Sequence, residues 1–391
     1  MEIARVNSDS KSLVGNKLKV GIVGATGMVG QQLLRMLKEH PWFEVPTLAA
    51  SASSAGVAYK DAVKDRWFMD FSLPEAIGKI KVVDAADLDA VTEAVDIVFC
   101  AVSMDKAEVL KLEDALAKKG VFVTSCNSAY RMDPLVPMMI PAANAEHLSV
   151  LSKQRPVRGY ESGAIIVKSN CSIQSYVLAL TALKEFEPVK VLVHSEQAIS
   201  GAGKTFAGWP EMVENVIPYI AGEEAKSEIE PLKIWGTLSE SGISSASTPK
   251  IKAKCVRVAV ADGHTAYVNV QFKKAPNKEA VLAAWEAFTN KSPAKGLPSA
   301  PAKQIYFQSE PDRPQPRLDV MRDGGMAVTI GQLEVEEAEA NATTTEPISV
   351  RFTALAHNAI LGAAGGAVLA TELAVKEGYV FRRVKAGLAA V

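Results

Sequence analysis

The glycine-spaced segment near the start of the chain constrains the fold more than any other part of the sequence. An apolar run, LKVGIV (18–23), leads into Gly24-x-x-Gly27-x-x-Gly30, and a helical pattern of apolar residues follows. Small residues in such a loop let the backbone approach a pyrophosphate, and the next helix presents free N–H groups to it. The order of strand, loop and helix favours a dinucleotide site over a purely structural turn.

Strands and helices continue to alternate through the first part of the chain. Thr47–Ala50, Val95–Val102 and Gly120–Thr124 are apolar and strand-like, and Lys106–Lys119 has a helical pattern. This alternation is typical of a parallel sheet with helices on both faces. We therefore expect an α/β, doubly wound domain of the Rossmann type from residue 18 to 168.

The pattern changes after residue 168. Lys190–Ala198 is strand-like, and Lys252–Val260 and Tyr267–Phe272 alternate between apolar and polar residues on either side of an Ala-Asp-Gly turn. The last two segments predict an antiparallel hairpin. We expect an α+β domain with a mainly antiparallel sheet over residues 169–357.

Composition excludes several classes of protein. The 391 residues carry 43 basic and 44 acidic side chains, so a generally basic nucleic-acid binder is excluded. The most apolar segment, Ala359–Ala370, is short for a membrane span and is expected to be a buried helix. Four cysteines without a Cys-x-x-Cys pair favour free thiols, hence a cytoplasmic protein without a metal site.

One cysteine has the context of a nucleophile. Cys171 lies between the apolar run Ala164–Val167 and a helical pattern, so its sulfur is expected at a helix N-terminus, where the dipole would lower the thiol pKa. Cys100, Cys126 and Cys255 lie in strand-like contexts and are interpreted as small buried residues. The position of Cys171 in the sequence is also compatible with an unreactive thiol.

Cysteine chemistry needs an acid–base group, and His264 is the candidate. It follows the Ala-Asp-Gly turn at the start of a strand, but spacing does not decide which of the five histidines meets Cys171. Glu223 and Lys226 are spaced as a surface ion pair in the first turn of a helix, and the residues alone favour that interpretation.

The end of the second strand bears on the cofactor. An acidic residue there would bind the ribose hydroxyls of NAD, whereas this chain has Ala50-Ser51-Ala52-Ser53-Ser54. Hydroxyls without a carboxylate tolerate a 2′-phosphate. The sequence therefore favours NADP, with NAD possible.

Taken together, these motifs resemble the aspartate-semialdehyde dehydrogenase family, and its archaeal and fungal branch in particular. The matching segments run in family order from residue 18 to about 380: GATGMVG (24–30), NSAYRMD (127–133), SNCS (169–172), QAISGAG (197–203), NVIPYIAGEEAK (215–226), CVRVAVADGH (255–264), PQPRLD (314–319), GMAVTIG (325–331) and HNAILGAAGG (357–366).

The resemblance implies a fold and a reaction. A Rossmann domain (18–168 plus 358–391) would regain the C-terminal helix, and the domain formed by residues 169–357 would carry catalysis and mediate a homodimer or homotetramer. The reaction implied is the reversible, NADP-dependent reduction of L-aspartyl-4-phosphate to aspartate 4-semialdehyde and phosphate. This step leads toward lysine, methionine and threonine.

The family pattern also implies roles for individual residues. Cys171 would be the acyl-thioester nucleophile, His264 the acid–base, and Gln197 the residue that orients the substrate. Arg257 would bind the α-carboxylate, for which a planar fork of donors is suited. Glu223 would hold the substrate ammonium group.

Further roles follow from the same resemblance. Arg131 and Lys226 would hold the departing phosphate, and Asn170 would contact the substrate beside the nucleophile. The expected cofactor-binding residues, from the glycine loop, the second strand and the nicotinamide side, are Gly24, Thr26, Gly27, Met28, Val29, Gly30, Ser51, Ser53, Ser54, Ser200, Gly201 and Asn358.

Two segments depart from the family pattern. Ser53-Ser54-Ala55-Gly56-Val57 replaces the usual Arg-Ser-Ala-Gly-Lys, which removes two positive charges and predicts relaxed preference between NADP and NAD. Lys204–Pro210 differs from the usual Tyr-Pro-Gly-Val-Pro, so substrate preference could differ there.

Three alternative functions remain open on the sequence. They are an acyl-CoA reductase of the malonyl-CoA type, an N-acetylglutamyl-phosphate reductase, and a non-catalytic nucleotide-binding protein. Neither alternative substrate offers a free ammonium group to Glu223, which favours the amino-acid substrate.

Overall fold

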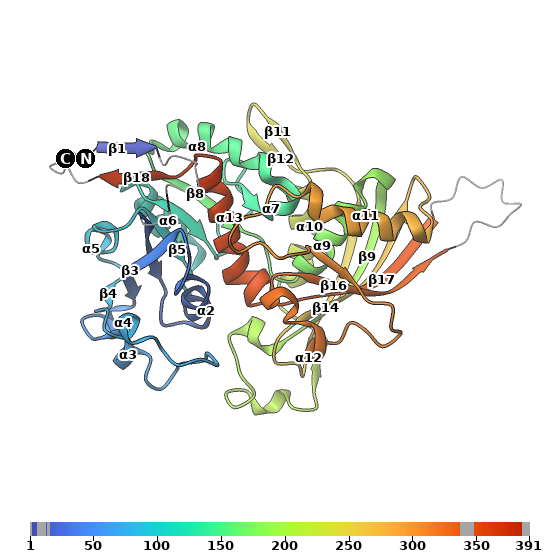
Figure 1. Ribbon diagram of the computed structural model, residues 1–391, viewed down its shortest axis with the longest axis horizontal. Coiled ribbons are helices and arrows are strands. Elements are labelled where there is room, and N and C mark those ends of the chain that lie inside the picture. Colours follow the sequence, from blue (N-terminus) through green and yellow to red (C-terminus); the bar gives the residue numbers. More distant parts are fainter. Residues whose placement is uncertain (1, 6–12, 14–15, 337–347, 385–391) are drawn as a thin grey trace, which may run out of the picture.

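The computed structural model describes residues 2–5, 13, 16–336 and 348–384, and these form two parts that lie side by side (Figure 1). Each part is built on a seven-stranded sheet. The first part holds the N-terminal strands together with the last helix of the chain, and the second holds most of residues 169–357.

The sheet of the first part is parallel throughout. Its strands follow the order β4-β3-β2-β5-β6-β8-β7, and every neighbouring pair is parallel. Their bounds in this order are Val83–Asp84, Phe43–Ala50, Leu18–Val23, Ile97–Cys100, Phe122–Ser125, Ala164–Lys168 and Met138–Met139. The strands β5, β6 and β8 are completely buried, as expected for a sheet covered on both faces. The predicted Rossmann-type sheet is confirmed.

Helices connect these parallel strands. Those between the strands are α2 (Met28–Leu37), α3 (Tyr59–Ala62), α4 (Glu75–Gly78), α5 (Leu88–Thr92), α6 (Lys106–Lys118), α7 (Pro141–Asn144) and α8 (Leu151–Arg158). In α2 the side chains of Leu33, Leu34 and Leu37 are buried against the sheet, whereas Arg35 is partly exposed. This apolar stripe fixes the helix that follows the glycine loop.

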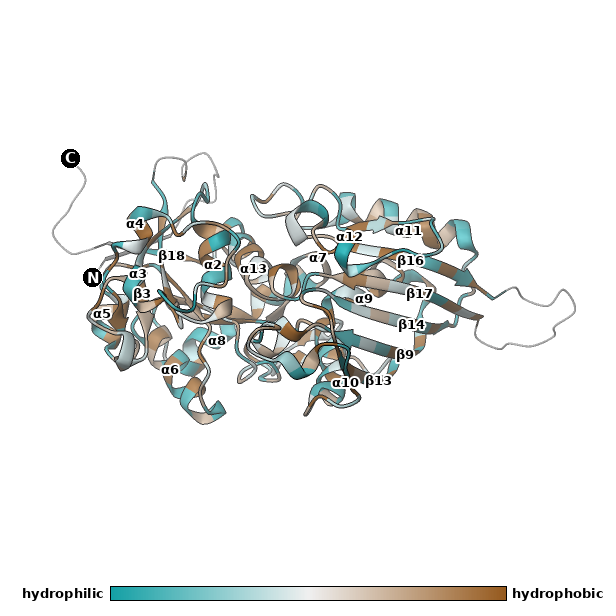
Figure 2. Cartoon of the chain, turned by 90° about the horizontal axis from the view of Figure 1, so that it is seen from below, coloured by the Kyte–Doolittle hydropathy of each residue, from teal (hydrophilic) through white to brown (hydrophobic). Residues whose placement is uncertain are grey.

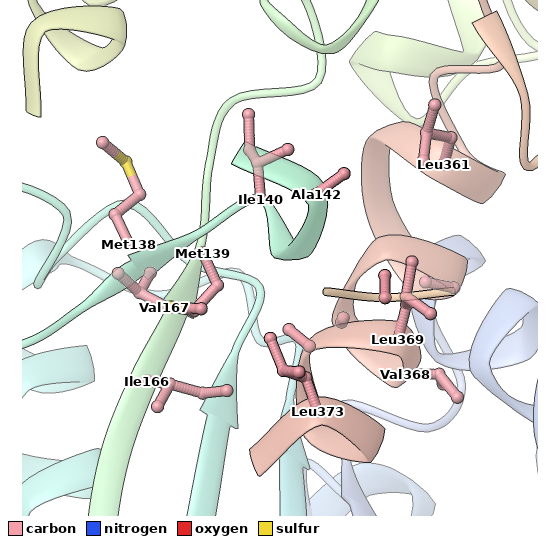
Figure 3. Packing of buried hydrophobic residues seen from close by; sticks show 14 of the residues in the cluster. Met138, Met139, Ile140, Ala142, Ile166, Val167, Leu361, Val368, Leu369 and Leu373 are labelled. Atoms are coloured by element: carbon pink, nitrogen blue, oxygen red, sulfur yellow. The ribbon is translucent and has the colours of Figure 1, made fainter. Parts of the chain in front are cut away.

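The C-terminal helix returns to the first part. A π-turn at Ile360–Ala364 leads into α13 (Gly365–Lys376), which packs against α2, α7, β6 and β8. Figure 3 shows Leu369 and Leu373 of α13 facing the core formed by Ile166 of β8 and Ala142 of α7. The expected buried helix is confirmed. Beyond it, β18 (Phe381–Val384) pairs with β1 (Glu2–Arg5) in antiparallel fashion.

The sheet of the second part is mixed. Its order is β10-β13-β9-β14-β17-β16-β15, in which the β13–β9 and β16–β15 pairs are parallel and the other four are antiparallel. The bounds in this order are Val216–Ile217, Lys250–Val258, Pro188–Gln197, His264–Phe272, Ile348–Ala356, Val328–Val335 and Ile305–Phe307. The expectation of a mainly antiparallel sheet is confirmed.

The predicted hairpin between the two alternating segments is wrong. Strands β13 and β14 run in opposite directions, but β9 lies between them and pairs with both. Because strands are spaced about 4.8 Å apart, the five residues 259–263 are long enough to cross one strand. Alternation indicates which face of a strand is buried, but not which strand is its neighbour.

One face of this sheet is covered by helices. These are α9 (Gln174–Ala182), α10 (Glu223–Ile234) and α11 (Lys278–Lys291), and Trp285 and Phe272 are among the large side chains buried beneath them. Figure 2 shows the strands β9, β14 and β17 beside these helices. Among the described residues, no helix has the length and apolar character needed to cross a membrane.

Candidate active site

A cavity of about 390 Å³ lies where the two parts meet. The first part contributes Met28, Val29 and Arg131 to its lining, and the second contributes Cys171 and Arg257. The remaining lining residues are Gln32, Cys126, Ser128, Lys168, Asn170, Gln197, Ser200, Gly201, Ile220, Ala221, Glu223, Lys226, Asn358, Ala359, Gly362 and Ala363. The cavity thus brings together the start of α2, which follows the glycine loop, and most of the residues expected to bind substrate.

The glycine loop at one end of the cavity has the close approaches that a dinucleotide site requires. A Cβ at Gly24 would lie 2.3 Å from the carbonyl oxygen of Ala101, and a Cβ at Gly30 would lie 2.3 Å from that of Gly24. Gly24 also has a φ of +90°, which disfavours other residues. The loop places the N-terminus of α2 at the carboxyl end of β2, where dinucleotide-binding folds hold their phosphates.

Cys171 and His264 meet at the cavity. Their Sγ and Nε2 atoms are 3.5 Å apart, although 93 residues separate them in the chain. Cys171 lies in the turn between β8 and α9, and His264 is the first residue of β14. The structure therefore selects His264 from the five histidines as the partner of the thiol.

The hydrogen bonds of His264 define its tautomer. The backbone N–H of Ala198 donates to Nδ1 at 3.1 Å, so Nδ1 carries no proton and the neutral ring carries its proton on Nε2. Burial, together with the nearby Arg257 guanidinium, lowers the pKa of His264 to about 3. At neutral pH a neutral Nε2–H group therefore faces the sulfur.

The expected lowering of the Cys171 pKa is wrong. Burial raises the pKa of this thiol, and Glu223 adds to the increase. The main opposing influence is the ammonium group of Lys168, followed by Arg131 and Arg257. Desolvation of the thiolate therefore outweighs the surrounding positive charge.

Lys168 is a buried cation that the sequence analysis did not select. It ends β8, its side chain is 2% exposed, and its Nζ donates to the carbonyl oxygen of Ser169 at 2.5 Å. Burial lowers the pKa of Lys168 to about 8, and the negative charge of a Cys171 thiolate would raise it. A charged residue at the end of the otherwise apolar run Ala164–Val167 is the signal that could have revealed it.

Glu223 is buried in the wall of the cavity, 7% exposed, so the surface interpretation of this residue is wrong. Its Oε1 accepts a hydrogen bond from Asn170 Nδ2 at 2.7 Å, and its Oε2 pairs with Lys226 Nζ at 3.1 Å. Asn170 in turn accepts from the backbone N–H of Ser172 at 2.9 Å. This chain of contacts fixes the Glu223 carboxylate beside the nucleophile.

A second buried carboxylate, Glu230, organises the other side of Cys171. Its Oε1 accepts from Arg131 Nη1 at 2.9 Å, and its Oε2 accepts from the backbone N–H of Asn170 at 2.6 Å. Arg131 Nε also donates to the carbonyl oxygen of Lys168 at 3.0 Å. Glu230 was missed, although it lies seven residues after Glu223 and so on the same face of α10.

The strand ends of the second sheet supply the remaining expected residues. Arg257 Nη1 donates to the carbonyl oxygen of Ala198 at 2.6 Å, and its guanidinium is buried in the cavity wall. Gln197 ends β9, and no partner is found for its buried Nε2 within the described residues. Such an unpaired donor at the cavity is available to a ligand.

Close approaches at two glycines bring the backbone next to the reacting groups. A Cβ at Gly201 would lie 3.0 Å from Arg257 Nη1 and 3.1 Å from His264 Nε2. A Cβ at Gly362, in the π-turn before α13, would lie 2.9 Å from the Cβ of Cys171. Gly362 is another residue that the sequence analysis did not select.

The expected nicotinamide-side residues lie together. Asn358 Nδ2 donates to Ser200 Oγ at 2.8 Å, and its Oδ1 accepts from the backbone N–H of Gly263 at 2.8 Å. Both side chains line the cavity next to Gly201.

Other expected cofactor residues lie outside the cavity lining. Ser51, Ser53 and Ser54 follow β3, with Ser53 and Ser54 in the short helix η1 (Ala52–Ser54). Gly24, Thr26, Gly27 and Gly30 belong to the loop and first turn of α2, of which only Met28 and Val29 line the cavity. Their part in binding a dinucleotide stays a prediction.

The other cysteines divide into two groups. Cys100 and Cys255 are buried in strands, as expected. Cys126 is partly exposed and lines the cavity, so it is not simply a small core residue. Within the described part of the chain, no group of three or more His, Cys, Asp or Glu side chains is arranged to hold a metal ion.

Comparison with known proteins now assigns the family. The model for the NAD-binding domain of semialdehyde dehydrogenases matches residues 19–151, and the model for their dimerisation domain matches residues 180–358. The chain belongs to the aspartate-semialdehyde dehydrogenase family. The resemblance stated from the sequence motifs is confirmed.

Named relatives of this family match over nearly the whole chain. The aspartate-semialdehyde dehydrogenase of Aspergillus fumigatus is 39% identical over 93% of this chain and 99% of its own length. That of Methanothermobacter thermautotrophicus is 40% identical over 91% of this chain and 98% of its own length. A fungal and an archaeal protein are thus similarly related to this family member.

A solved structure supports the fold. The Candida albicans aspartate-semialdehyde dehydrogenase, determined with NADP, superposes with a TM-score of 0.80 at 33% identity, covering 92% of this chain and 99% of that one. The predicted oxidoreductase class and fold are therefore confirmed, and none of the three alternative functions is favoured.

Proposed function

We propose that this member of the family catalyses the reversible, NADP-dependent reduction of L-aspartyl-4-phosphate to L-aspartate 4-semialdehyde and phosphate. The observation that carries the proposal is the 3.5 Å distance between Cys171 Sγ and His264 Nε2. These residues meet at a cavity that is also lined by the start of α2, the helix after the glycine loop. The charges around this pair match the proposed substrate group by group.

The chain fits a dinucleotide on its own geometry. Side chains at Gly24 and Gly30 would collide with the backbone of Ala101 and of Gly24, so the glycines keep the loop tight at the start of α2, and Ser200, Gly201 and Asn358 line the cavity. When bound, NADPH supplies a hydride to the acyl carbon. Ser200, Gly201 and Asn358 would hold its reacting end, and the absence of a side chain at Gly201 leaves the space beside Arg257 and His264 open.

Cys171 would act as a covalent catalyst. Its thiolate attacks the acyl-phosphate carbon, a C–S bond forms, and the C–O bond to phosphate breaks with the electron pair leaving on the phosphate. After reduction, the alkoxide form of the thiohemiacetal forms its carbonyl again as the C–S bond breaks, and the electron pair of that bond leaves on the sulfur as a thiolate. Lys168, Arg131 and Arg257 stabilise that anion electrostatically.

His264 would act mainly as a hydrogen-bond donor. Because Ala198 N–H occupies Nδ1, the neutral ring offers Nε2–H to the sulfur, and this contact favours the thiolate each time it leaves. In the reverse reaction the same group stabilises the oxygen that becomes negative when the thiolate adds to the aldehyde.

The charged residues would recognise the two ends of the substrate. Arg257 presents a fork of donors to the α-carboxylate, while Gln197 orients the substrate through its free Nε2. The substrate ammonium would replace Lys226 on Glu223, and Lys226 would then join Arg131 at the phosphate. In the structure the Glu223–Lys226 ion pair keeps these two charges together in the cavity wall.

The decisive assay is phosphate-dependent reduction of NADP by the purified protein with aspartate semialdehyde. Turnover is expected with this aldehyde and to depend on phosphate. N-acetylglutamate semialdehyde, and malonate semialdehyde with coenzyme A, are the matched alternative substrates. Faster turnover with either would contradict the proposal, as would turnover that ignores phosphate.

We also infer that the open face of the second sheet pairs with a second copy of this chain. Leu192 and Tyr267, each 43% exposed, lie on this face, which lines a groove of about 760 Å³ and also carries Lys252, Glu334 and Arg351. Exposed apolar residues with charges of both signs suit a self-complementary interface. Light scattering should show a dimer or tetramer that Tyr267→Asp dissociates; an unchanged mass for this variant would contradict the inference.

Two further expectations remain proposals. The domain division at 168/169 and 357/358 agrees with the change from the parallel sheet to the mixed one, since β8 ends at Lys168 and β17 ends at Ala356. A cytoplasmic location is supported by the four free cysteines.

A further inference from the structure

The loop after β3 contacts a positive charge that comes from another segment. Arg66 Nη2 donates a hydrogen bond to Ser54 Oγ at 2.8 Å, and its Nε donates to the carbonyl oxygen of Ala62 at 3.1 Å. Ser54 is buried, whereas Arg66 is exposed. The guanidinium therefore lies next to the Ser51–Ser54 loop, at the position where the sequence lacks the two positive charges of the family pattern.

Two buried side chains hold the segment that carries Arg66 against the glycine loop. Tyr59 OH donates to the carbonyl oxygen of Ala25 at 2.7 Å, and Gln31 Nε2 donates to those of Thr26 at 3.1 Å and Arg66 at 2.7 Å. The backbone N–H of Phe68 donates to Gln31 Oε1 at 2.8 Å. Tyr59 and Gln31 are fully buried, so the position of Arg66 is fixed relative to the pyrophosphate loop.

The neighbouring strand end carries a carboxylate with one oxygen already hydrogen-bonded to the backbone. Asp84 on β4 is the register partner of Ala50 on β3, and its Oδ1 accepts from the backbone N–H of Ala86 at 2.9 Å. The hydroxyl groups of Ser51 and Ser53 are exposed and lie 3.0 Å apart. This edge of the sheet thus combines hydroxyls, one guanidinium and a carboxylate with one oxygen that accepts a backbone hydrogen bond.

We propose that Arg66, together with the hydroxyls of Ser51, Ser53 and Ser54, binds the 2′-phosphate of NADP and makes this chain prefer NADP over NAD. The proposal rests on the proposed function only in taking the ligand to be a nicotinamide dinucleotide. In dinucleotide-binding folds the adenosine ribose lies at the end of the second strand, and an arginine there accommodates a 2′-phosphate. A guanidinium presents paired donors to phosphate oxygens, so it compensates for the missing Arg and Lys.

The test is direct binding of NADP⁺, NAD⁺ and 2′,5′-ADP by titration calorimetry, with no substrate present. For Arg66→Gln we expect the Kd of NADP⁺ and of 2′,5′-ADP to rise about 10- to 100-fold, as for the loss of a charge-assisted hydrogen bond, and that of NAD⁺ to change less than about threefold. Lys64→Gln removes an exposed positive charge from the same segment and serves as the matched control. Its affinities should stay within about twofold of wild type.

Two further variants keep the test decisive. Arg66→Lys should recover part of the NADP⁺ affinity, and Ser51→Asp should weaken NADP⁺ and strengthen NAD⁺ because a carboxylate repels the 2′-phosphate and binds the ribose. Equal losses for both dinucleotides in Arg66→Gln, or none for NADP⁺, would overturn the assignment. If the wild type binds no dinucleotide, the proposed function itself fails, so the two failures are distinguishable.

Discussion

The two walls of the active-site cavity are built from different chemical groups. The wall at the start of α2 presents the side chains of Met28 and Val29, held by the glycine loop behind them, whereas the wall around Cys171 presents buried charged side chains from both parts of the molecule. The first wall depends on close backbone approach, which one added methyl group disrupts. The second depends on balanced charge, which an isosteric neutral substitution disrupts. Substitutions in the first wall should therefore weaken cofactor binding, and substitutions in the second should impair substrate binding or catalysis.

The largest effect is expected for Cys171→Ala, which tests whether the second wall holds the chemistry. Without a nucleophile no thioester forms, so kcat should fall by more than about a thousandfold, while NADPH binding, followed by fluorescence titration, stays within about twofold. Cys100→Ala removes a buried thiol outside the cavity and serves as the control. Activity of Cys171→Ala within tenfold of wild type would reject the nucleophile.

A methyl group added to the first wall should weaken the binding of NADP⁺ without changing the reactivity of the Cys171 thiol. In Gly30→Ala the new Cβ would lie 2.3 Å from the Gly24 carbonyl oxygen and displace the loop. We expect NADP⁺ affinity to fall about a hundredfold and the protein to lose about 1–3 kcal/mol of stability, measured by calorimetry and urea unfolding. In Gly21→Ala, the control, the Cβ would make ordinary contacts of 3.5 Å with Val95. Equal affinities in both variants would show that the loop does not bind the dinucleotide.

Neutralising one charge in the second wall should act on the substrate and spare the cofactor. Glu223→Gln keeps the shape of the side chain but removes the partner of the ammonium group, so KM for aspartate semialdehyde should rise about 10- to 100-fold. Glu224→Gln is the matched control, because Glu224 pairs with Lys254 at 3.0 Å instead of lining the cavity. A change in NADP⁺ affinity equal to the change in KM would remove the distinction between the walls.

The smallest effect concerns the pH dependence of Cys171. Burial raises its thiol pKa and Lys168 opposes the increase, so removing that cation in Lys168→Met should raise the pKa further. We expect the midpoint of iodoacetamide labelling to move up by about one pH unit, which makes labelling about tenfold slower below the midpoint. Mass spectrometry separates Cys171 from Cys126, which also lines the cavity.

An exposed lysine at the far end of β9 provides the control for this pH profile. Lys190→Met should leave the midpoint unchanged, since Lys190 lies at the opposite end of the strand from Gln197. A Lys168→Met midpoint that stays in place or moves down would show that Lys168 does not stabilise the thiolate.

The sequence predicts the first wall better than the second for a physical reason. The strand–loop–helix order around Gly24 is formed by residues close together in the chain. The spacing of the glycines and the pattern of apolar residues therefore predict it almost completely. Contacts such as that of Cys171 with His264, or of Glu223 with Asn170, join residues far apart in the chain. No local pattern encodes these contacts. The residues alone made His264 a candidate partner of Cys171, and only the resemblance to a family favoured it over the other histidines.

The errors have the same origin. The predicted hairpin failed because β9 enters from earlier in the chain and separates β13 from β14. The Cys171 pKa was misjudged because burial depends on the whole cavity, while the helix N-terminus is visible locally. Arg66 was overlooked because its neighbour Ser54 lies 12 residues earlier, with a helix between them.

The return of α13 to the parallel sheet has a consequence for how the protein is made. Val368 and Leu369 fill the core beside α2 and β8, so the half synthesised first lacks part of its interior until the last helix has left the ribosome. Nascent chains ending near residue 340 should accordingly expose an apolar groove and bind chaperones, even though every strand of that first sheet has already been translated.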